Sequence, residues 1–176
     1  VVDGRTGSGG MDTCNATTRK DAREADGFSV NPTLWDFYTT GAGKDYARAG
    51  SGTVATESSA TAEVPWDVYT DEVKNSVADY GDAAIVTLSR VGGEGADLSY
   101  GEVNYLALDE NEKALLANLA EMKKNGQIQK IVVLINSANA LQVDFLKDNE
   151  YDIDAALWIG DVGITGINAV AQILVG

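Results

Sequence analysis

The sequence predicts an α/β protein, a three-layer α/β/α sandwich built on a mainly parallel sheet. Three short runs of residues, at 84–88, 131–135 and 155–159, are apolar on both faces, as the strands of a covered parallel sheet are. Segments with helical spacing separate these runs, and this alternation is typical of α/β folds. At 176 residues the chain is long enough to bury a core as a single domain, 1–176.

The first part of this domain, 1–63, is expected to be irregular because it is rich in Gly, Ser, Thr, Ala and Asp. Its clearest element is a short helix, which Asn31 caps and Pro32 begins. The stretch 41–63 is interpreted as a long loop, a feature that is often functional inside a compact domain.

The second part, 64–176, is expected to be regular. Asp109 and Glu112 predict a capping box at the start of one helix, which Asn125 and Gly126 end. The helices expected in this part cover about 71–80, 109–125, 140–147 and 166–174.

Charge and composition restrict the partners. The chain has 13 Lys and Arg against 27 Asp and Glu, a net charge of -14, which argues against nucleic acid or an anionic membrane surface. No apolar run approaches the ~20 residues that span a bilayer, and the first residues do not resemble a signal peptide. We expect a soluble protein, with the cytoplasm slightly favoured, although the single cysteine, Cys14, leaves the redox compartment open.

The sequence contains no histidine. This excludes His-based metal sites, Ser-His-Asp triads and Cys-His dyads, so acid-base chemistry must fall to carboxylates. No metal and no cofactor are expected.

Three weak motifs have simpler explanations. The segment 41–44 lacks the upstream glycine and the strand of a phosphate loop, and 92–95 lacks the spacing of a dinucleotide loop. Asp148, Asp152 and Asp154 resemble a calcium loop only loosely, without its turn glycine or its closing glutamate. We interpret these aspartates as a solvated connection.

The segment 89–97 is the candidate for chemistry. Glu94 stands between glycines after a buried strand, at the edge of a parallel sheet where ligands gather. Glycines let the backbone turn sharply and leave room for a ligand. The alternative is a surface turn with a solvated glutamate.

Several segments, in the correct order, resemble the α/β-sandwich domain of family 3 glycoside hydrolases. The segment 84–97 is similar to the family's strand followed by SR-x-x-GEG-x-D. The segment 6–10 resembles the family's glycine-rich loop, and 105–116 resembles its next helix. The segments 131–136 and 158–176 resemble its next strand and its closing W-x-G run.

The resemblance implies retaining hydrolysis of β-linked glycosides or oligosaccharides, with β-glucosidase the favoured specificity. In the family a (β/α)₈ barrel supplies an aspartate nucleophile and the sandwich lends a glutamate as general acid/base, which would be Glu94. Arg90, Asp97 and Ser8 are expected to bind substrate or to support the loops. The loops 7–11 and 92–97 are expected at the same edge of the sheet.

The sequence also departs from the family. Leu98 stands where the family often has arginine, and no segment has the barrel pattern or the nucleophile's motif. We therefore expect a piece of a larger enzyme, inactive without its barrel. The alternative from another class is a non-catalytic carbohydrate-binding or interaction module on the same fold.

Overall fold

The computed structural model describes residues 19–46, 63–90, 98, 104–160, 162 and 166–176. In this part of the chain the sheet has three strands, β1 (Ala84–Arg90), β2 (Ile131–Ser137) and β3 (Ala155–Trp158). Their order is β1-β2-β3 and both pairs are parallel, with Ala84 opposite Ile131 and Val132 opposite Ala155. The predicted strands and their parallel direction are confirmed.

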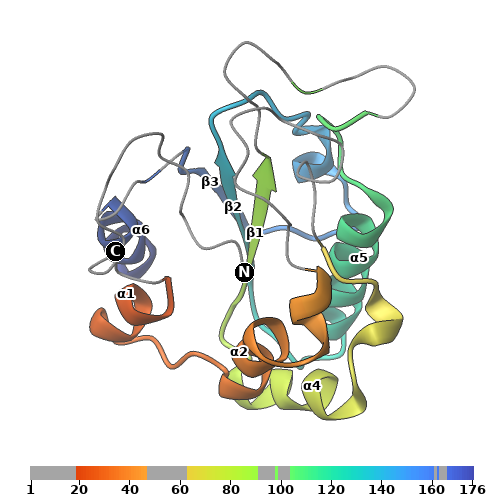
Figure 1. Cartoon of the computed structure of the whole chain (residues 1–176), viewed down its shortest axis with the longest axis vertical. Helices are drawn as coiled ribbons and strands as arrows, with labels where there is room; N and C mark the ends of the chain where they lie inside the picture. Colours follow the sequence, from red (N-terminus) through yellow and green to blue (C-terminus); the bar gives the residue numbers. More distant parts are fainter. Residues whose placement is uncertain (1–18, 47–62, 91–97, 99–103, 161, 163–165) are drawn as a thin grey trace.

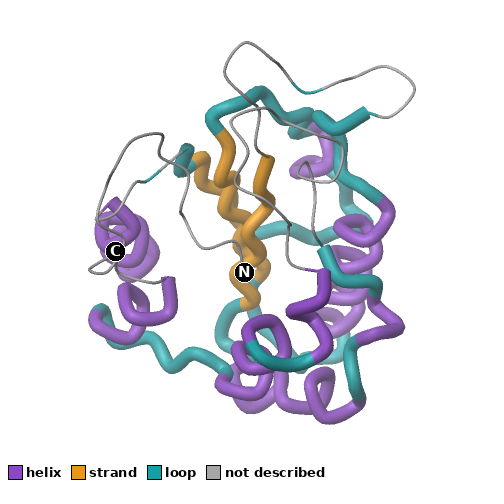
Figure 2. The backbone as a smooth tube through the Cα atoms, in the orientation of Figure 1, coloured by secondary structure: helices purple, strands orange, loops and turns teal. Residues whose placement is uncertain are grey.

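Helices cover both faces of the sheet (Figure 1, Figure 2). One face carries α5 (Glu110–Lys124), with α2 (Pro32–Thr39) and α4 (Asp71–Ser76) beside it. The other face carries α6 (Gly166–Val175), against which α1 (Arg19–Ala25) packs. The predicted three-layer α/β/α sandwich is therefore the observed architecture.

The two-sided apolar pattern of β2 explains this layering. Ile131 and Val133 belong to the larger core cluster, together with Leu116 of α5. Leu134 points to the opposite face and forms the smaller cluster with α6, which contributes Ile167. All of these side chains are at most 5% exposed, so β2 is buried on both faces, whereas Ala155, Ala156 and Trp158 of β3 are exposed in the described structure.

The helix starts follow the predicted caps. Asn31 accepts a hydrogen bond from the Leu34 N–H at 3.1 Å, and its amide donates to the Ser76 carbonyl at 3.1 Å, which ties α2 to the end of α4. The predicted helix over 71–80 consists of α4 followed by a 3₁₀ turn at Val77–Tyr80.

Two expectations differ from the structure. The predicted helix near 140–147 is wrong, since only a 3₁₀ turn forms at Asp144–Lys147. The Gln142 N–H donates instead to the Leu106 carbonyl at 2.7 Å, which holds this segment against a neighbouring loop. The expected loop over 41–63 begins with a 3₁₀ turn at Ala42–Tyr46, and 47–62 lies outside the described residues.

Candidate active site

The carboxyl ends of β1 and β2 lie side by side, because the register places Arg90 opposite Ser137. The Ser89 hydroxyl donates to the Asn136 carbonyl at 3.3 Å across the two strands. The Ser137 hydroxyl donates to the Asn139 carbonyl at 2.8 Å and accepts from the Asn139 N–H at 3.0 Å. This polar edge is where a parallel sheet commonly binds its ligand.

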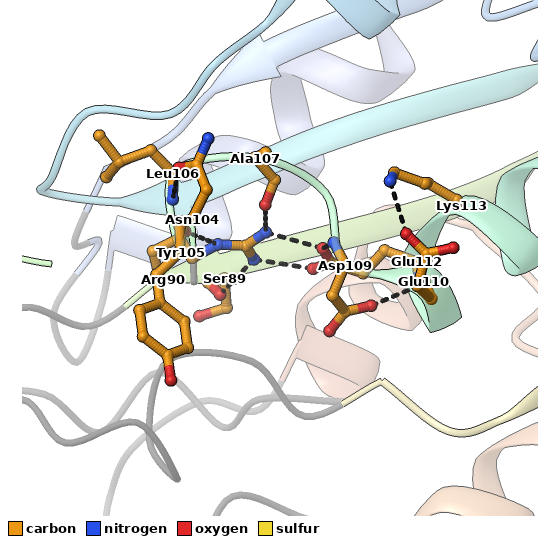
Figure 3. Close-up of polar contacts among 10 residues, drawn as sticks. All are labelled: Ser89, Arg90, Asn104, Tyr105, Leu106, Ala107, Asp109, Glu110, Glu112 and Lys113. Carbon is orange, nitrogen blue, oxygen red and sulfur yellow. Dashed lines mark hydrogen bonds and ion pairs between the residues drawn. The ribbon is translucent and has the colours of Figure 1, made fainter. Parts of the chain in front are cut away.

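Arg90, the last residue of β1, is 2% exposed, and its guanidinium is completely bonded within the chain (Figure 3). Its Nη1 and Nη2 each donate to one carboxylate oxygen of Glu112 at 2.7 Å. Nε donates to the Tyr105 carbonyl at 2.7 Å, Nη2 to the Ala107 carbonyl at 2.7 Å and Nη1 to the Ser89 carbonyl at 2.9 Å. A guanidinium has five N–H donors, so none is left for a ligand.

Glu112 joins this arginine to the start of α5. Its backbone N–H donates to the Asp109 carboxylate at 2.8 Å, and its own carboxylate accepts the Asp109 N–H at 2.9 Å, which completes the predicted capping box. Burial raises the pKa of the Glu112 carboxyl, while the hydrogen bonds and charge of Arg90 oppose that rise. One buried carboxylate thus caps a helix and neutralises an arginine.

These contacts form a clamp, made of Arg90, Glu112, Tyr105 and Ala107, beside the candidate catalytic segment. The clamp bonds Arg90 to carbonyls 15 and 17 residues further along the chain. The clamp therefore joins the carboxyl end of β1 to the residues that lead into α5.

Of the predicted site residues, the structure describes Arg90 alone. Glu94, Asp97 and Ser8 lie outside the described residues, as do the loops 7–11 and 92–97. Leu98, which stands where the family often has arginine, is buried at 6% exposure.

A second buried polar cluster was not predicted from the sequence. Glu63 accepts hydrogen bonds from the Tyr38 hydroxyl at 2.9 Å, the Tyr69 hydroxyl at 2.8 Å and the Val64 N–H at 2.7 Å. The two tyrosine hydroxyls also bond to each other. Burial, together with the nearby Glu63 carboxylate, raises the pKa of both tyrosines. The three residues come from separate segments, so no sequence spacing indicated them.

The aspartates that loosely resembled a calcium loop have other roles where the structure describes them. Asp154 accepts from the Ile131 N–H at 2.8 Å and pairs with Lys123 at 2.7 Å and Lys130 at 3.1 Å. Asp152 also pairs with Lys123, at 3.0 Å. Within the described ranges, no three His, Cys, Asp or Glu side chains gather in a way that could hold a metal ion. In the same part of the chain, no helix has the length and apolar character needed to cross a membrane.

The fold defines an α/β-sandwich domain with a polar edge at the carboxyl ends of β1 and β2. The family model described as the glycosyl hydrolase family 3 C-terminal domain matches residues 10–176. This chain therefore belongs to the C-terminal domain family of family 3 glycosyl hydrolases. Among curated proteins, none matches the sequence significantly.

Solved structures share the fold. A β-glucosidase from Paenibacillus barengoltzii superposes with a TM-score of 0.73 at 23% identity, covering 99% of this chain and 18% of that one. β-Glucosidase 3B from Thermotoga neapolitana, in complex with α-D-glucose, gives 0.71 at 20% identity, covering 96% of this chain and 22% of that one. This chain thus spans about a fifth of the length of these enzymes.

Proposed function

We propose that this chain is the sandwich domain of a retaining β-glycosidase of the β-glucosidase type, and that Glu94 is its general acid/base. The main support is the family match over 10–176, together with the likeness to two β-glucosidases, one of them in complex with glucose. The substrate would be a β-linked glycoside or oligosaccharide. The nucleophile would come from a (β/α)₈ barrel of the full-length protein.

The clamp supports the proposed role of Glu94, because it fixes the backbone close to this residue in the sequence. Acid-base catalysis needs a carboxyl held within hydrogen-bond reach of the departing oxygen. Glu94 is four residues after Arg90, whose side chain is fixed by five hydrogen bonds. Of the two roles expected for Arg90, we therefore assign the support of the loop, because its N–H donors are all used within the chain. Asp97 and Ser8 keep the expected roles of loop support or substrate contact.

In the proposed reaction, protonated Glu94 gives its proton to the glycosidic oxygen as the barrel aspartate attacks the anomeric carbon. The bond to the leaving group breaks, and a covalent glycosyl-enzyme remains. The Glu94 carboxylate then takes a proton from the water that attacks the same carbon. This step releases the aspartate and restores the protonated glutamate, and the anomeric configuration is retained.

The test uses the full-length protein with Glu94→Ala. With a natural disaccharide, whose leaving group needs protonation, we expect kcat/KM to fall by roughly 10²- to 10⁴-fold. With an activated aryl glycoside the first step needs no proton, so the covalent intermediate accumulates and its breakdown limits turnover. Azide attacks that intermediate without base assistance, and should partly restore turnover and give a glycosyl azide of retained configuration.

Asp97→Ala is the matched control, because it removes a carboxylate from the same segment. It should lower activity on both kinds of substrate alike and show no azide rescue. The assignment fails if Glu94→Ala keeps near-normal activity on the disaccharide, or if azide rescues Asp97→Ala instead. A full-length protein without any glycosidase activity, yet able to bind sugar, would favour the non-catalytic module.

A further inference from the structure

The helix α5 ends at Asn125 and Gly126, the one place in the sequence where an asparagine precedes a glycine. Both residues are exposed. Asparagine reacts most readily before glycine, because the next backbone nitrogen can attack the side-chain amide and glycine has no Cβ to obstruct the approach. The space around Gly126 is open as well, since a Cβ added there would meet no atom within 4 Å.

The folded chain holds the attacking nitrogen in a helix cap. The Gly126 N–H donates to the Lys123 carbonyl at 3.0 Å. The Gln127 N–H donates to the Met122 carbonyl at 2.9 Å. This pair of bonds is a Schellman motif, in which Gly126 takes the left-handed conformation at φ 76°. The nitrogen of Gly126 must therefore leave its carbonyl partner before it can react.

These two bonds belong to the last, exposed turn of α5, where opening is local and costs far less than unfolding the domain. Asn118 of the same helix offers a contrast. Its amide donates to the Ala114 carbonyl at 2.7 Å, and the next residue, Leu119, is 7% exposed. The same reaction at Asn118 would require the middle of the helix to unwind and a core side chain to leave its place.

We propose that Asn125 is a site of spontaneous conversion to aspartate and isoaspartate. The Gly126 nitrogen attacks Cγ of Asn125 and forms a bond to it. The Cγ–Nδ2 bond breaks, and ammonia leaves with the proton of the Gly126 nitrogen. Water then opens the resulting cyclic imide. Cleavage on the Cγ side gives aspartate, whereas cleavage on the backbone carbonyl side gives isoaspartate, in which the main chain runs through the side chain.

Both products weaken the end of the helix. They place a carboxylate where the helix dipole is already negative. The Asn125 amide now donates to the Glu121 carboxylate at 3.3 Å, and this contact would become a pair of like charges. Isoaspartate also adds a carbon to the main chain between α5 and β2. That connection is fixed further along, because Ile128 is 2% exposed and the Gln129 N–H donates to the Gly81 carbonyl at 2.7 Å.

The test is incubation of the full-length protein at mildly alkaline pH, with peptide mass spectrometry at intervals. We expect aspartate and isoaspartate to accumulate at Asn125, and the isoaspartate to accept a methyl group from an isoaspartyl methyltransferase. The reaction should be roughly 5- to 100-fold slower in the folded protein than in urea, because two hydrogen bonds must open first. Asn118 is the internal control and should stay unchanged in the folded protein over the same time.

Two variants measure the consequence for the helix. Asn125→Asp carries the new charge from the start, and should lower the folding equilibrium constant in urea unfolding by roughly 2- to 5-fold. Asn125→Gln keeps the neutral amide on a longer side chain, so it should react far more slowly and fold as the unmodified protein does.

Three results would overturn the proposal. Conversion of Asn125 that is more than roughly 10³-fold slower in the folded protein would mean that the reaction needs global unfolding. Equal rates at Asn125 and Asn118 would mean that the helix end plays no part. An unchanged folding constant in Asn125→Asp would contradict the inferred damage to α5. The inference is independent of the role of Glu94.

Discussion

Arg90→Met is the substitution whose effect follows most directly from the structure. Glu112 is 4% exposed, and its two carboxylate oxygens accept from the guanidinium at 2.7 Å. Methionine would leave this carboxylate buried without its partner, and the carbonyls of Tyr105 and Ala107 would lose their donors as well. Breaking a buried ion pair on one side costs about 3–5 kcal/mol. Since whole domains are stable by about 5–15 kcal/mol, this is a large part of the total.

The double variant Arg90→Met/Glu112→Met separates the charge from the other contacts. The double variant removes both charges together. Its loss of unfolding free energy should therefore be about 1–3 kcal/mol smaller than the sum of the losses in the two single variants. If the proposed glycosidase function holds, the double variant of the full-length protein should still lose activity, because the carbonyls of Tyr105 and Ala107 lose their hydrogen bonds from Arg90.

The assay is urea unfolding followed by far-ultraviolet circular dichroism, with the slope of the transition checked in each variant. Lys113→Met is the matched control. Lys113 pairs with Glu110 on the same helix at 2.7 Å, but the two side chains are 45% and 90% exposed, so its loss should cost less than ~1 kcal/mol. If Arg90→Met costs no more than Lys113→Met, the clamp does not stabilise the domain and the reasoning is refuted.

Two other predictions concern single positions. Burial alone would raise the pKa of Asp154, but hydrogen bonds from two lysines and one backbone N–H outweigh it and lower the pKa to about 2. Asp154→Asn should therefore cost about 1 kcal/mol at pH 7 after solvent screening. In urea unfolding at a series of pH values, this difference should shrink as the pH falls below about 4 and disappear only once the pH has passed below about 2; a constant difference would contradict the pKa. A Cβ at Gly81 would lie 2.3 Å from the Gln127 carbonyl oxygen, so Gly81→Ala should lower stability by about 1–3 kcal/mol. Gly166→Ala, whose Cβ would meet only an ordinary contact at 3.4 Å, should not destabilise, and equal thermal shifts for the two variants would contradict this reading.

The strands were predictable because each signal is local and strong. Continuous Ile, Val and Leu in β2 require cover on both faces, and that requirement fixes both the parallel sheet and its layers. The capping box at Asp109 was equally readable, since both of its partners lie within four residues. The prediction of a helix near 140–147 was wrong because the deciding contact is not local. A tertiary hydrogen bond from the Gln142 N–H to the Leu106 carbonyl determines the backbone there.

The helix α1 was missed because its sequence, RKDAREA, has no apolar stripe, and it is placed by packing against α6. The candidate site was predictable only in part, because its contacts also join residues that are distant in the sequence. Arg90 could be selected from the resemblance, but its partner Glu112 is 22 residues away and has a complete local explanation as a helix cap. The cluster of Tyr38, Glu63 and Tyr69 joins three segments that sequence spacing does not relate.

The clamp at Arg90 has a consequence for how such domains can diverge. It bonds the end of β1 to the carbonyls of Tyr105 and Ala107, so the contacts that join the two ends of the intervening sequence belong to the sandwich itself. Each doubling of a flexible loop adds only about 0.6 kcal/mol of closure entropy. Changes of length in the sequence between these ends should therefore cost little closure entropy as long as the clamp and the buried Leu98 are kept.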